Sequence, residues 1–240
     1  MMRLIAGSAF AALLSVPAAA QQAADAVAPE VDTMEAGFSA ASPEVEAALA
    51  AKAEGRPVEA EKWMVAAANP LAVEAGARVL AEGGSAADAM VAVQAVLGLV
   101  EPQSSGMGGG AFLVWYDAAE NRLTTLDGRE TAPRAATPKL FLDDNGEPLQ
   151  FYDAVVGGRS VGTPGTPMLM QAAHERWGKL DWAGLFDDAI ALASGGFAVS
   201  PRLAGQIAED SDRLGRFTTT ANYFLPGGEP LAAGDQLQNP

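Results

Sequence analysis

The sequence predicts a protein of the α+β class, in which helices cover a sheet that begins as an antiparallel hairpin. Three observations support this prediction. Residues 69–100 carry helix caps and helical periodicity, residues 112–126 alternate like a hairpin around a turn, and further helical segments follow. With 240 residues, of which 49% are hydrophobic, the chain can bury one sizeable core.

Capping residues define the first helix. Asn69 suits the N-cap, Pro70 suits the first helical position, and Gly83 lies just past the expected end. Charged residues recur at every fourth position on one face, which favours an amphipathic helix at the surface. Its apolar stripe comprises Leu71, Ala75, Val79 and Leu80.

A second helix follows almost at once. Ser85 and Asp88 form the start of a capping box, with Asp in the place of the usual Glu or Gln. The stretch 86–100 is then apolar on nearly every side except at Gln94, so we expect it to be largely buried. Pro102 prevents its extension.

Two strands and three further helices complete the expected order. Residues 112–116 and 122–126 predict the strands of a hairpin, with the turn at 117–121. Ser200 is the expected N-cap of the last helix. The later helices are expected at 167–177, 182–193 and 201–214.

The N-terminal part of the chain predicts export. Arg3, an apolar run to Val16 and an Ala-rich cleavage site before Gln21 are typical of a signal peptide over residues 1–20. An uncleaved anchor and a misassigned start codon are the alternatives. Residues 21–62, rich in Ala, Glu and Pro, predict a flexible leader, with a short helix near 44–53. The folded part is expected at 63–240, and the location is expected to be periplasmic or secreted.

Charge and composition exclude several classes of partner. The formal net charge of −15 repels phosphate groups, so neither nucleic acid nor an anionic membrane is an expected partner. The chain has no Cys and a single His, so we expect neither disulfides nor a transition-metal site.

The glycine-rich loop imitates a nucleotide-binding motif. Residues 106–111 fit the pattern G-x-G-x-x-A, which binds a pyrophosphate only where it follows a strand and begins a helix. Here a predicted helix comes first and a strand comes after. The order therefore argues against a dinucleotide cofactor, and no P-loop sequence is present.

Residues 158–162 match the G-x-S-x-G pattern of a serine nucleophile. That pattern needs a helix directly after Ser160, which the following turn-rich residues 163–167 prevent. The only available base, His174, is expected on an exposed helix face. Serine hydrolysis is therefore a weak alternative, and paired-carboxylate chemistry in the segment 127–130 is weaker still.

Arg129 is the candidate binding residue. It follows the second predicted strand and precedes a Pro-rich loop, where a guanidinium can enter a cleft. Arginine is suited to hold a carboxylate through two parallel hydrogen bonds. On the residues alone, a solvated surface arginine remains the alternative.

The motifs "MVAAANPLAVEAGARVLAEGGSAADA", "EPQSSGMGGGAF", "LDGRETAPRAAT" and "GTPGTPMLMQAAHERWGKL" resemble the γ-glutamyltransferase family, and the resemblance extends from Trp63 to Pro240. It implies an N-terminal-nucleophile hydrolase with an αββα sandwich that is incomplete in this chain, and a precursor that cleaves itself into a large and a small subunit. It also implies that Arg129 holds the α-carboxylate of the γ-glutamyl group. The glycine loop would then pack closely between a buried helix and a strand.

One departure from the family concerns the nucleophile. The family uses the threonine that becomes the first residue of the small subunit, in a Thr-Thr-His-like motif. Residues 218–220 are Thr-Thr-Thr, without the histidine or a strand context. We therefore assign no catalytic residue in this chain and expect the nucleophile beyond Pro240. Residues 63–240 are then the N-terminal part of a large subunit, and Asn239 and Pro240 repeat the pair that begins the first helix.

The resemblance implies a γ-glutamyltransferase and glutathione hydrolase without cofactor or metal, with glutathione as substrate and the small subunit as partner. Two alternatives remain: an acylase of the same fold that removes glutaryl-like groups, and a non-catalytic binding fragment. Without strands from a small subunit, a hydrophobic sheet face should be uncovered.

Overall fold

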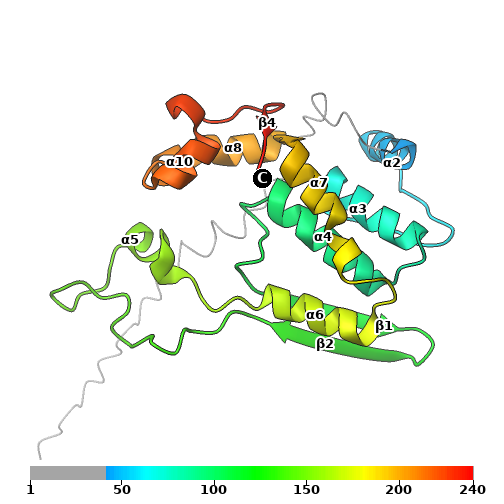
Figure 1. The fold of residues 1–240 in the computed structure, drawn as a ribbon, viewed down its shortest axis with the longest axis horizontal. Helices are drawn as coiled ribbons and strands as arrows, with labels where there is room; N and C mark the ends of the chain where they lie inside the picture. Colours follow the sequence, from blue (N-terminus) through cyan, green and yellow to red (C-terminus); the bar gives the residue numbers. More distant parts are fainter. Residues whose placement is uncertain (1–41, 240) are drawn as a thin grey trace, which may run out of the picture. The chain divides into compact units, whose positions relative to one another are not determined.

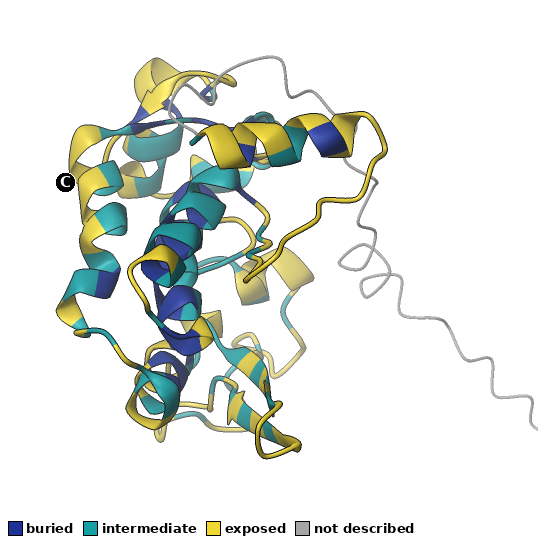
Figure 2. Ribbon diagram, turned by 90° about the vertical axis from the view of Figure 1, so that its right-hand side faces the viewer, coloured by how far each residue is buried: buried dark blue, intermediate teal, exposed yellow. Residues whose placement is uncertain are grey.

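Two helices form the centre of the fold. The structure, a computed structural model, describes residues 42–239. Helix α3 (Pro70–Ala81) packs along α4 (Ala86–Val100), and most of the buried apolar side chains lie on or around these two helices (Figures 1 and 2). The predicted mixture of helix and strand and the burial of α4 are both confirmed.

The predicted helix caps are confirmed. Asn69 is the N-cap of α3 and precedes Pro70 at the first helical position. Its side chain accepts a hydrogen bond from the backbone N–H of Leu71. Ser85 and Asp88 bind each other's backbone N–H in a reciprocal capping box. These local bonds fix where both central helices begin.

The predicted hairpin consists of β1 (Ala111–Asp117) and β2 (Arg122–Gly128), paired in antiparallel register. One face packs on α6 (Thr166–Trp177), where Trp115 stacks on Trp177 with ring centroids 4.5 Å apart. The strands alternate between exposed and half-buried positions, visible as bands in Figure 2. The other face carries four apolar side chains that are 59–68% exposed, as expected: Phe112, Val114, Tyr116 and Leu123. Thr125 and Asp127 lie opposite Val114 and Phe112 on the same face.

The later helices agree with the prediction in place but not in continuity. The segment 182–193 begins with the 3₁₀ turn η2 (Ala183–Phe186) before α7 (Asp187–Gly195). The segment 201–214 is divided at Asp210 into α8 (Pro201–Glu209), which Ser200 caps as predicted, and α9 (Ser211–Leu214). The remaining elements are α5 (Phe151–Val155), η1 (Gly158–Ser160), β3 (Phe197–Ala198), α9 (Ser211–Leu214), α10 (Thr218–Phe224), η3 (Pro226–Gly228) and β4 (Gln236–Leu237).

A buried carboxylate joins three elements at the end of α4. Glu101 is only 2% exposed, and its Oε1 accepts hydrogen bonds from Asn69 Nδ2 at 2.9 Å and from Ser200 Oγ at 3.1 Å. Its Oε2 accepts a bond from Gln103 Nε2 at 2.6 Å. Since Asn69 and Ser200 are the N-caps of α3 and α8, one carboxylate lies at the positive ends of two helices.

A second buried carboxylate ties α4 to the segment after α6. Asp88 Oδ2 accepts hydrogen bonds from the backbone N–H of Ser85 at 2.8 Å and of Lys179 at 2.9 Å. Burial raises the pKa of Asp88, but the hydrogen bonds from the backbone of Ser85, Lys179 and Leu180 and from the Ser85 hydroxyl together outweigh burial and hold this pKa below its ordinary value. The ionised carboxylate therefore stabilises the fold at neutral pH, and this stabilisation is lost as the pH falls through the lowered pKa.

The predicted signal peptide lies outside the described residues, as does the leader before residue 42. Among the described residues, α2 (Pro43–Ala53) packs on α3 with Val45 buried, and the backbone N–H of Ser42 donates to Glu74. Within residues 42–239, every helix is too short or too polar to cross a bilayer.

The hydrogen bonds to the buried Glu101 carboxylate, called the Glu101 hub below, predict a large loss of stability when this side chain is shortened. Glu101→Ala leaves two buried donors without their acceptor, so the free energy of unfolding should fall by about 3 kcal/mol or more. Glu101→Gln keeps one oxygen acceptor and should lose less. Urea unfolding followed by tryptophan fluorescence measures both changes. Glu147→Ala, an exposed control, should change stability by under about 0.5 kcal/mol, and an equal loss in Glu101→Ala and this control would contradict the role of the hub.

The uncovered hairpin face predicts self-association of the 240-residue chain. Replacing Phe112 and Val114 together by serine should reduce light scattering and binding of a hydrophobic dye, because both side chains are exposed on this face. Val58 is exposed but lies outside the hairpin, so Val58→Ser serves as control and should have little effect. Equal scattering from the double variant and wild type would mean that the hairpin does not drive association.

Candidate functional site

Arg129 lies directly after β2, with its side chain mostly in solvent. Its backbone N–H donates to Asp127 Oδ1 at 3.0 Å, and its side chain is 63% exposed. The nearest charged group is the neighbouring carboxylate, with Arg129 Nε 3.3 Å from Glu130 Oε2. The guanidinium therefore keeps most of its donors available for a ligand.

At two glycines beside Arg129, neighbouring chain segments approach so closely that a side chain would overlap other atoms. A Cβ on Gly165 would lie 2.0 Å from the carbonyl oxygen of Gly128, and one on Gly110 would lie 2.6 Å from Glu130 Oε2. The backbone N–H groups of Gly165 and Thr166 both donate to the Gly109 carbonyl oxygen, at 3.0 and 3.1 Å. The segment that carries Arg129 is thus clamped between the glycine loop and the start of α6.

The expected close packing of the glycine loop is confirmed for Gly110 but not for the whole loop. A Cβ on Gly108 would meet nothing within 4 Å, and one on Gly106 would only touch the nitrogen of Gly108 at 4.0 Å. The spacing of glycines in the sequence could not separate these positions, because the approach depends on residues 128–130, which are distant in sequence.

The chain leaves the site after Thr131 and returns beside it at Thr163. Thr131 and Thr163 exchange backbone hydrogen bonds, with N···O distances of 3.4 and 2.8 Å. A Cβ on Gly162 would lie 2.8 Å from Glu130 Cβ. The excursion 132–162 therefore begins and ends beside the residue pair Arg129–Glu130, which holds that pair in position.

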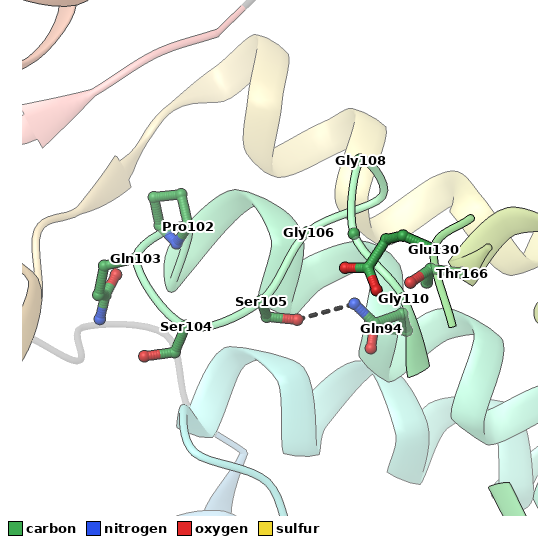
Figure 3. A pocket seen from close by; sticks show the side chains of 11 residues that line it. Gln94, Pro102, Gln103, Ser104, Ser105, Gly106, Gly108, Gly110, Glu130 and Thr166 are labelled. Carbon is green, nitrogen blue, oxygen red and sulfur yellow. Dashed lines mark hydrogen bonds between the residues drawn. The ribbon is translucent and has the colours of Figure 1, made fainter. Parts of the chain in front are cut away.

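A polar cavity of about 480 Å³ lies between the glycine loop, α4 and Glu130 (Figure 3). Gln94 donates to Ser105 Oγ at 2.7 Å across it, and Thr166 forms part of the wall. Glu130 Oε2 is buried without a hydrogen-bond partner among the described residues. A carboxylate in the wall repels phosphate, and α4 precedes the loop while β1 follows it, so both observations support the prediction that the glycines bind no nucleotide.

The serine pattern is not a nucleophile elbow. Ser160 ends the short turn η1, and its hydroxyl donates to the carbonyl oxygen of Val155 at 2.6 Å. The expectation that His174 is exposed was wrong: its side chain is 19% exposed, packs edge-on against Trp182, and its Nε2 lies 2.9 Å from the Leu180 carbonyl oxygen. The segment 178–182 folds back over this face of α6 because Asp88 binds its backbone.

The Thr-Thr-Thr sequence forms the first turn of α10 rather than a strand. The expectation that residues 218–220 lack a strand context is confirmed. Glu130 is the residue of the site that sequence reasoning missed, since it was weighed only as one of a pair of carboxylates. Its position after Arg129 was the available indication, but its burial was not visible in the sequence.

Comparison with solved structures defines the class. The crystal structure of Helicobacter pylori gamma-glutamyltranspeptidase has a TM-score of 0.72 and 34% identity, over 76% of this chain and 52% of that chain. The fold is therefore that of the N-terminal-nucleophile hydrolases, as predicted, with the described residues forming part of its layers.

Sequence comparison defines the family. The family model described as Gamma-glutamyltranspeptidase matches residues 72–240, and the chain belongs to this family. The glutathione hydrolase proenzyme of Bacillus subtilis (strain 168) is 45% identical over 174 residues, which are 72% of this chain and 30% of that protein. The acylase ACY 1 proenzyme of Pseudomonas sp. (strain SE83) is 36% identical over 189 residues, 77% of this chain and 34% of that protein. The chain thus spans about a third of the length of these curated relatives.

The glycine clamp predicts different effects of alanine at two positions of one loop. Gly110→Ala should lower the free energy of unfolding by about 1–3 kcal/mol, because its Cβ overlaps Glu130 and the backbone of residue 128. Gly108→Ala is the matched control and should change it by less than about 0.5 kcal/mol, since its Cβ points into open space. Urea unfolding midpoints measure both, and a loss in Gly108→Ala as large as that in Gly110→Ala would show that the clamp is not the cause.

Proposed function

We propose that the complete protein is a glutathione hydrolase and γ-glutamyltransferase. The observation that carries this proposal is the family match over residues 72–240, which includes Arg129 and all of the glycines that hold it. In the proposed reaction, a threonine hydroxyl attacks the γ-amide carbonyl and gives its proton to the threonine's own α-amino group. The C–N bond of the amide then breaks, the amine leaves with that proton, and a γ-glutamyl-enzyme remains. Water then releases glutamate, or an amino acid or peptide accepts the group.

The nucleophile and the second subunit are proposed to come from the same precursor by self-cleavage. Two observations support this. The similar proteins from Bacillus subtilis and Pseudomonas carry the name proenzyme and are about three times as long as the matched region. The outer face of the hairpin carries four apolar side chains that no described residue covers, as expected for a sheet that takes a further layer.

Arg129 is proposed to hold the α-carboxylate of the donor. The exposed guanidinium on a rigid backbone fits this role, because a planar group with free donors can bind a carboxylate with two parallel bonds. Such a grip orients the donor so that its γ-amide meets the nucleophile. Glu130, 3.3 Å from Arg129 Nε, restricts the orientation of the guanidinium.

The proposed location is the periplasm or the outside of the cell. This rests on the signal-peptide pattern of residues 1–20 alone. Amino-terminal sequencing of the mature protein tests it, and a mature chain that retains Met1 would contradict export through cleavage.

The alternative function is that of an acylase for glutaryl-like groups, favoured by the 36% identity with the acylase ACY 1 proenzyme. A glutaryl group has the same distal carboxylate but lacks the α-amino group. Rates on γ-glutamyl and glutaryl anilides separate the two functions. Faster cleavage of the glutaryl anilide would replace the first proposal, and cleavage of neither would favour a binding protein.

The proposed role of Arg129 predicts a selective loss of donor binding. In the complete enzyme, Arg129→Ala and Arg129→Lys should each raise KM for a γ-glutamyl donor roughly tenfold to several hundredfold, since a charge-assisted pair contributes about 1.5–3.5 kcal/mol. Lysine keeps the charge but loses the planar fork, so it should not restore binding fully. Self-cleavage needs no donor carboxylate and should continue in both variants.

A donor with an amidated α-carboxylate provides the decisive comparison. Wild type should prefer the free acid strongly, whereas Arg129→Ala should barely distinguish the two donors. Arg134→Ala, an exposed arginine of the same excursion, is the control and should behave like wild type. If Arg129→Ala keeps the full preference for the free acid, Arg129 does not bind the carboxylate.

A further inference from the structure

Gln94 is the one uncharged polar side chain of the otherwise apolar helix α4, in which Asp88 serves as part of the cap. It is half-buried in the middle of the helix, where it neither begins nor ends it. A polar side chain that leaves water costs free energy unless it forms a hydrogen bond. The place of Gln94 in this helix therefore depends on its partner.

The partner of Gln94 is Ser105, the residue directly before the glycine loop. Gln94 Nε2 donates to Ser105 Oγ at 2.7 Å, the bond drawn in Figure 3. The backbone N–H of Ser105 donates to the carbonyl oxygen of Glu101 at 3.0 Å. One bond comes from the middle of α4 and the other from its C-cap, so Ser105 is fixed relative to this helix.

The preceding residue, Ser104, is held from another side. Its hydroxyl oxygen accepts a hydrogen bond from Arg202 Nη2 of α8 at 3.0 Å. Its backbone N–H also donates to the Glu101 carbonyl oxygen, at 3.0 Å. The two serines are therefore the near anchor of the glycine loop, and Gln94 supplies the bond to this anchor from α4.

The far anchor of the loop is Gly109, whose carbonyl oxygen accepts the N–H groups of Gly165 and Thr166. Between the anchors the glycines pack loosely. A Cβ on Gly108 would meet nothing within 4 Å, and one on Gly106 would only touch a nitrogen at 4.0 Å. The position of this middle part thus depends on the two anchors more than on close packing of its glycines.

The anchored loop forms part of the polar cavity beside the candidate site. Gln94, Ser105 and the loop backbone line the cavity together with Glu130. Glu130 Oε2 lies 3.3 Å from Arg129 Nε, so the cavity extends up to the proposed donor-binding arginine. A shift of the loop would change the space in which groups meet beside Arg129, and a misplacement of about 1 Å can lower a rate on the order of a hundredfold.

We propose that Gln94 and Ser105 are a positioning pair, which holds the glycine loop so that the cavity beside Arg129 stays open to the reacting groups. The pair acts through the loop and touches no reacting atom. The proposal rests on the proposed function, because only that function brings a donor to Arg129. It explains why an apolar helix carries one glutamine at this place.

Replacing the pair should affect rate and stability differently. In the complete enzyme, Gln94→Leu and Ser105→Ala should each lower kcat/KM for a γ-glutamyl anilide roughly tenfold to a hundredfold. The unfolding midpoint of Gln94→Leu should stay at or above that of wild type, because leucine suits an apolar helix and a polar pair can be lost at little cost. Ser105→Thr keeps the hydroxyl and should restore most of the rate. Gln206→Leu, on the exposed side of α8, is the matched control and should keep the wild-type rate.

The double variant tests whether the two residues act as one unit. Gln94→Leu combined with Ser105→Ala should lose no more than about threefold beyond the weaker single variant, since both changes remove the same bond. A loss equal to the product of the two single losses would mean that they act separately, and would overturn the pair. Each variant should keep the wild-type preference for a donor with a free α-carboxylate over its amide. Loss of that preference would also contradict the proposal, because the grip of Arg129 would then be affected instead.

Hydrogen exchange tests the anchor without reference to activity. In the 240-residue chain, the backbone amides of Ser104 and Ser105 should exchange at least about tenfold faster in Gln94→Leu than in wild type, because the turn at Glu101 opens more often without the side-chain bond. The amides of α3 are the internal control and should keep their rates. Equal exchange of the two serines in both proteins would overturn the anchor.

The two measurements separate failure of this proposal from failure of the proposed function. Faster exchange with an unchanged rate on the anilide would leave the bond but overturn its role in the reaction. A lowered midpoint, with a rate that returns to the wild-type value at lower temperature, would show a merely structural role. A complete wild-type protein that cleaves no γ-glutamyl anilide would overturn the proposed function and the role assigned within it, whatever the exchange rates.

Discussion

The buried carboxylate of Glu101 is the interaction on which the rest of the structure depends. It binds the N-cap side chains of α3 and α8, so the starts of two helices and the end of a third meet at one group. A buried charge is tolerated only where donors surround it, and here the two caps and Gln103 supply them. The carbonyl oxygen of Glu101 also accepts the N–H groups of Ser104 and Ser105, which sets the path of the chain into the glycine loop. The position of the candidate site therefore depends on the position of Glu101.

The features that were predicted correctly from sequence are those that neighbouring residues decide. Asn69, Ser85 and Ser200 cap helices because each binds an N–H two or three residues away, which a sequence pattern contains. The interruption at Asp210 was missed. The burial of His174 was also missed, because Asp88, which is distant in sequence, holds the segment that covers it. The roles of Asp88 and Glu101 as buried hubs were missed for the same reason. Asp88 was recognised as a cap, yet the carboxylate also binds residues 179 and 180, about ninety positions further along the chain.

The candidate site divides in the same way. Arg129 is the candidate binding residue because the motif around it resembles a family, whereas its position at a strand end alone favours a solvated surface arginine. Glu130 and the clamp were not predicted, since only the folded chain brings Gly110, Gly165 and Gly128 within van der Waals contact. The sequence shows many glycines in the loop but not which of them lack room for a side chain. Of the loop glycines, Gly110 is the one where a Cβ would overlap other atoms, so its conformational freedom matters less than its size.

These constraints suggest a division of labour within the family fold. The described residues supply a backbone held by close glycine packing, a guanidinium whose orientation Glu130 restricts, and a polar cavity. Ser160 and the threonines of α10, the hydroxyls singled out by sequence motifs, are held in local turns rather than presented beside a base. Under the proposed function, another part of the polypeptide brings the reacting groups to Arg129, and that part can contact only surfaces that are open here. The hairpin face with its exposed apolar side chains is open in this sense, so the residues proposed to orient a donor and a face that can receive a partner lie on one unit.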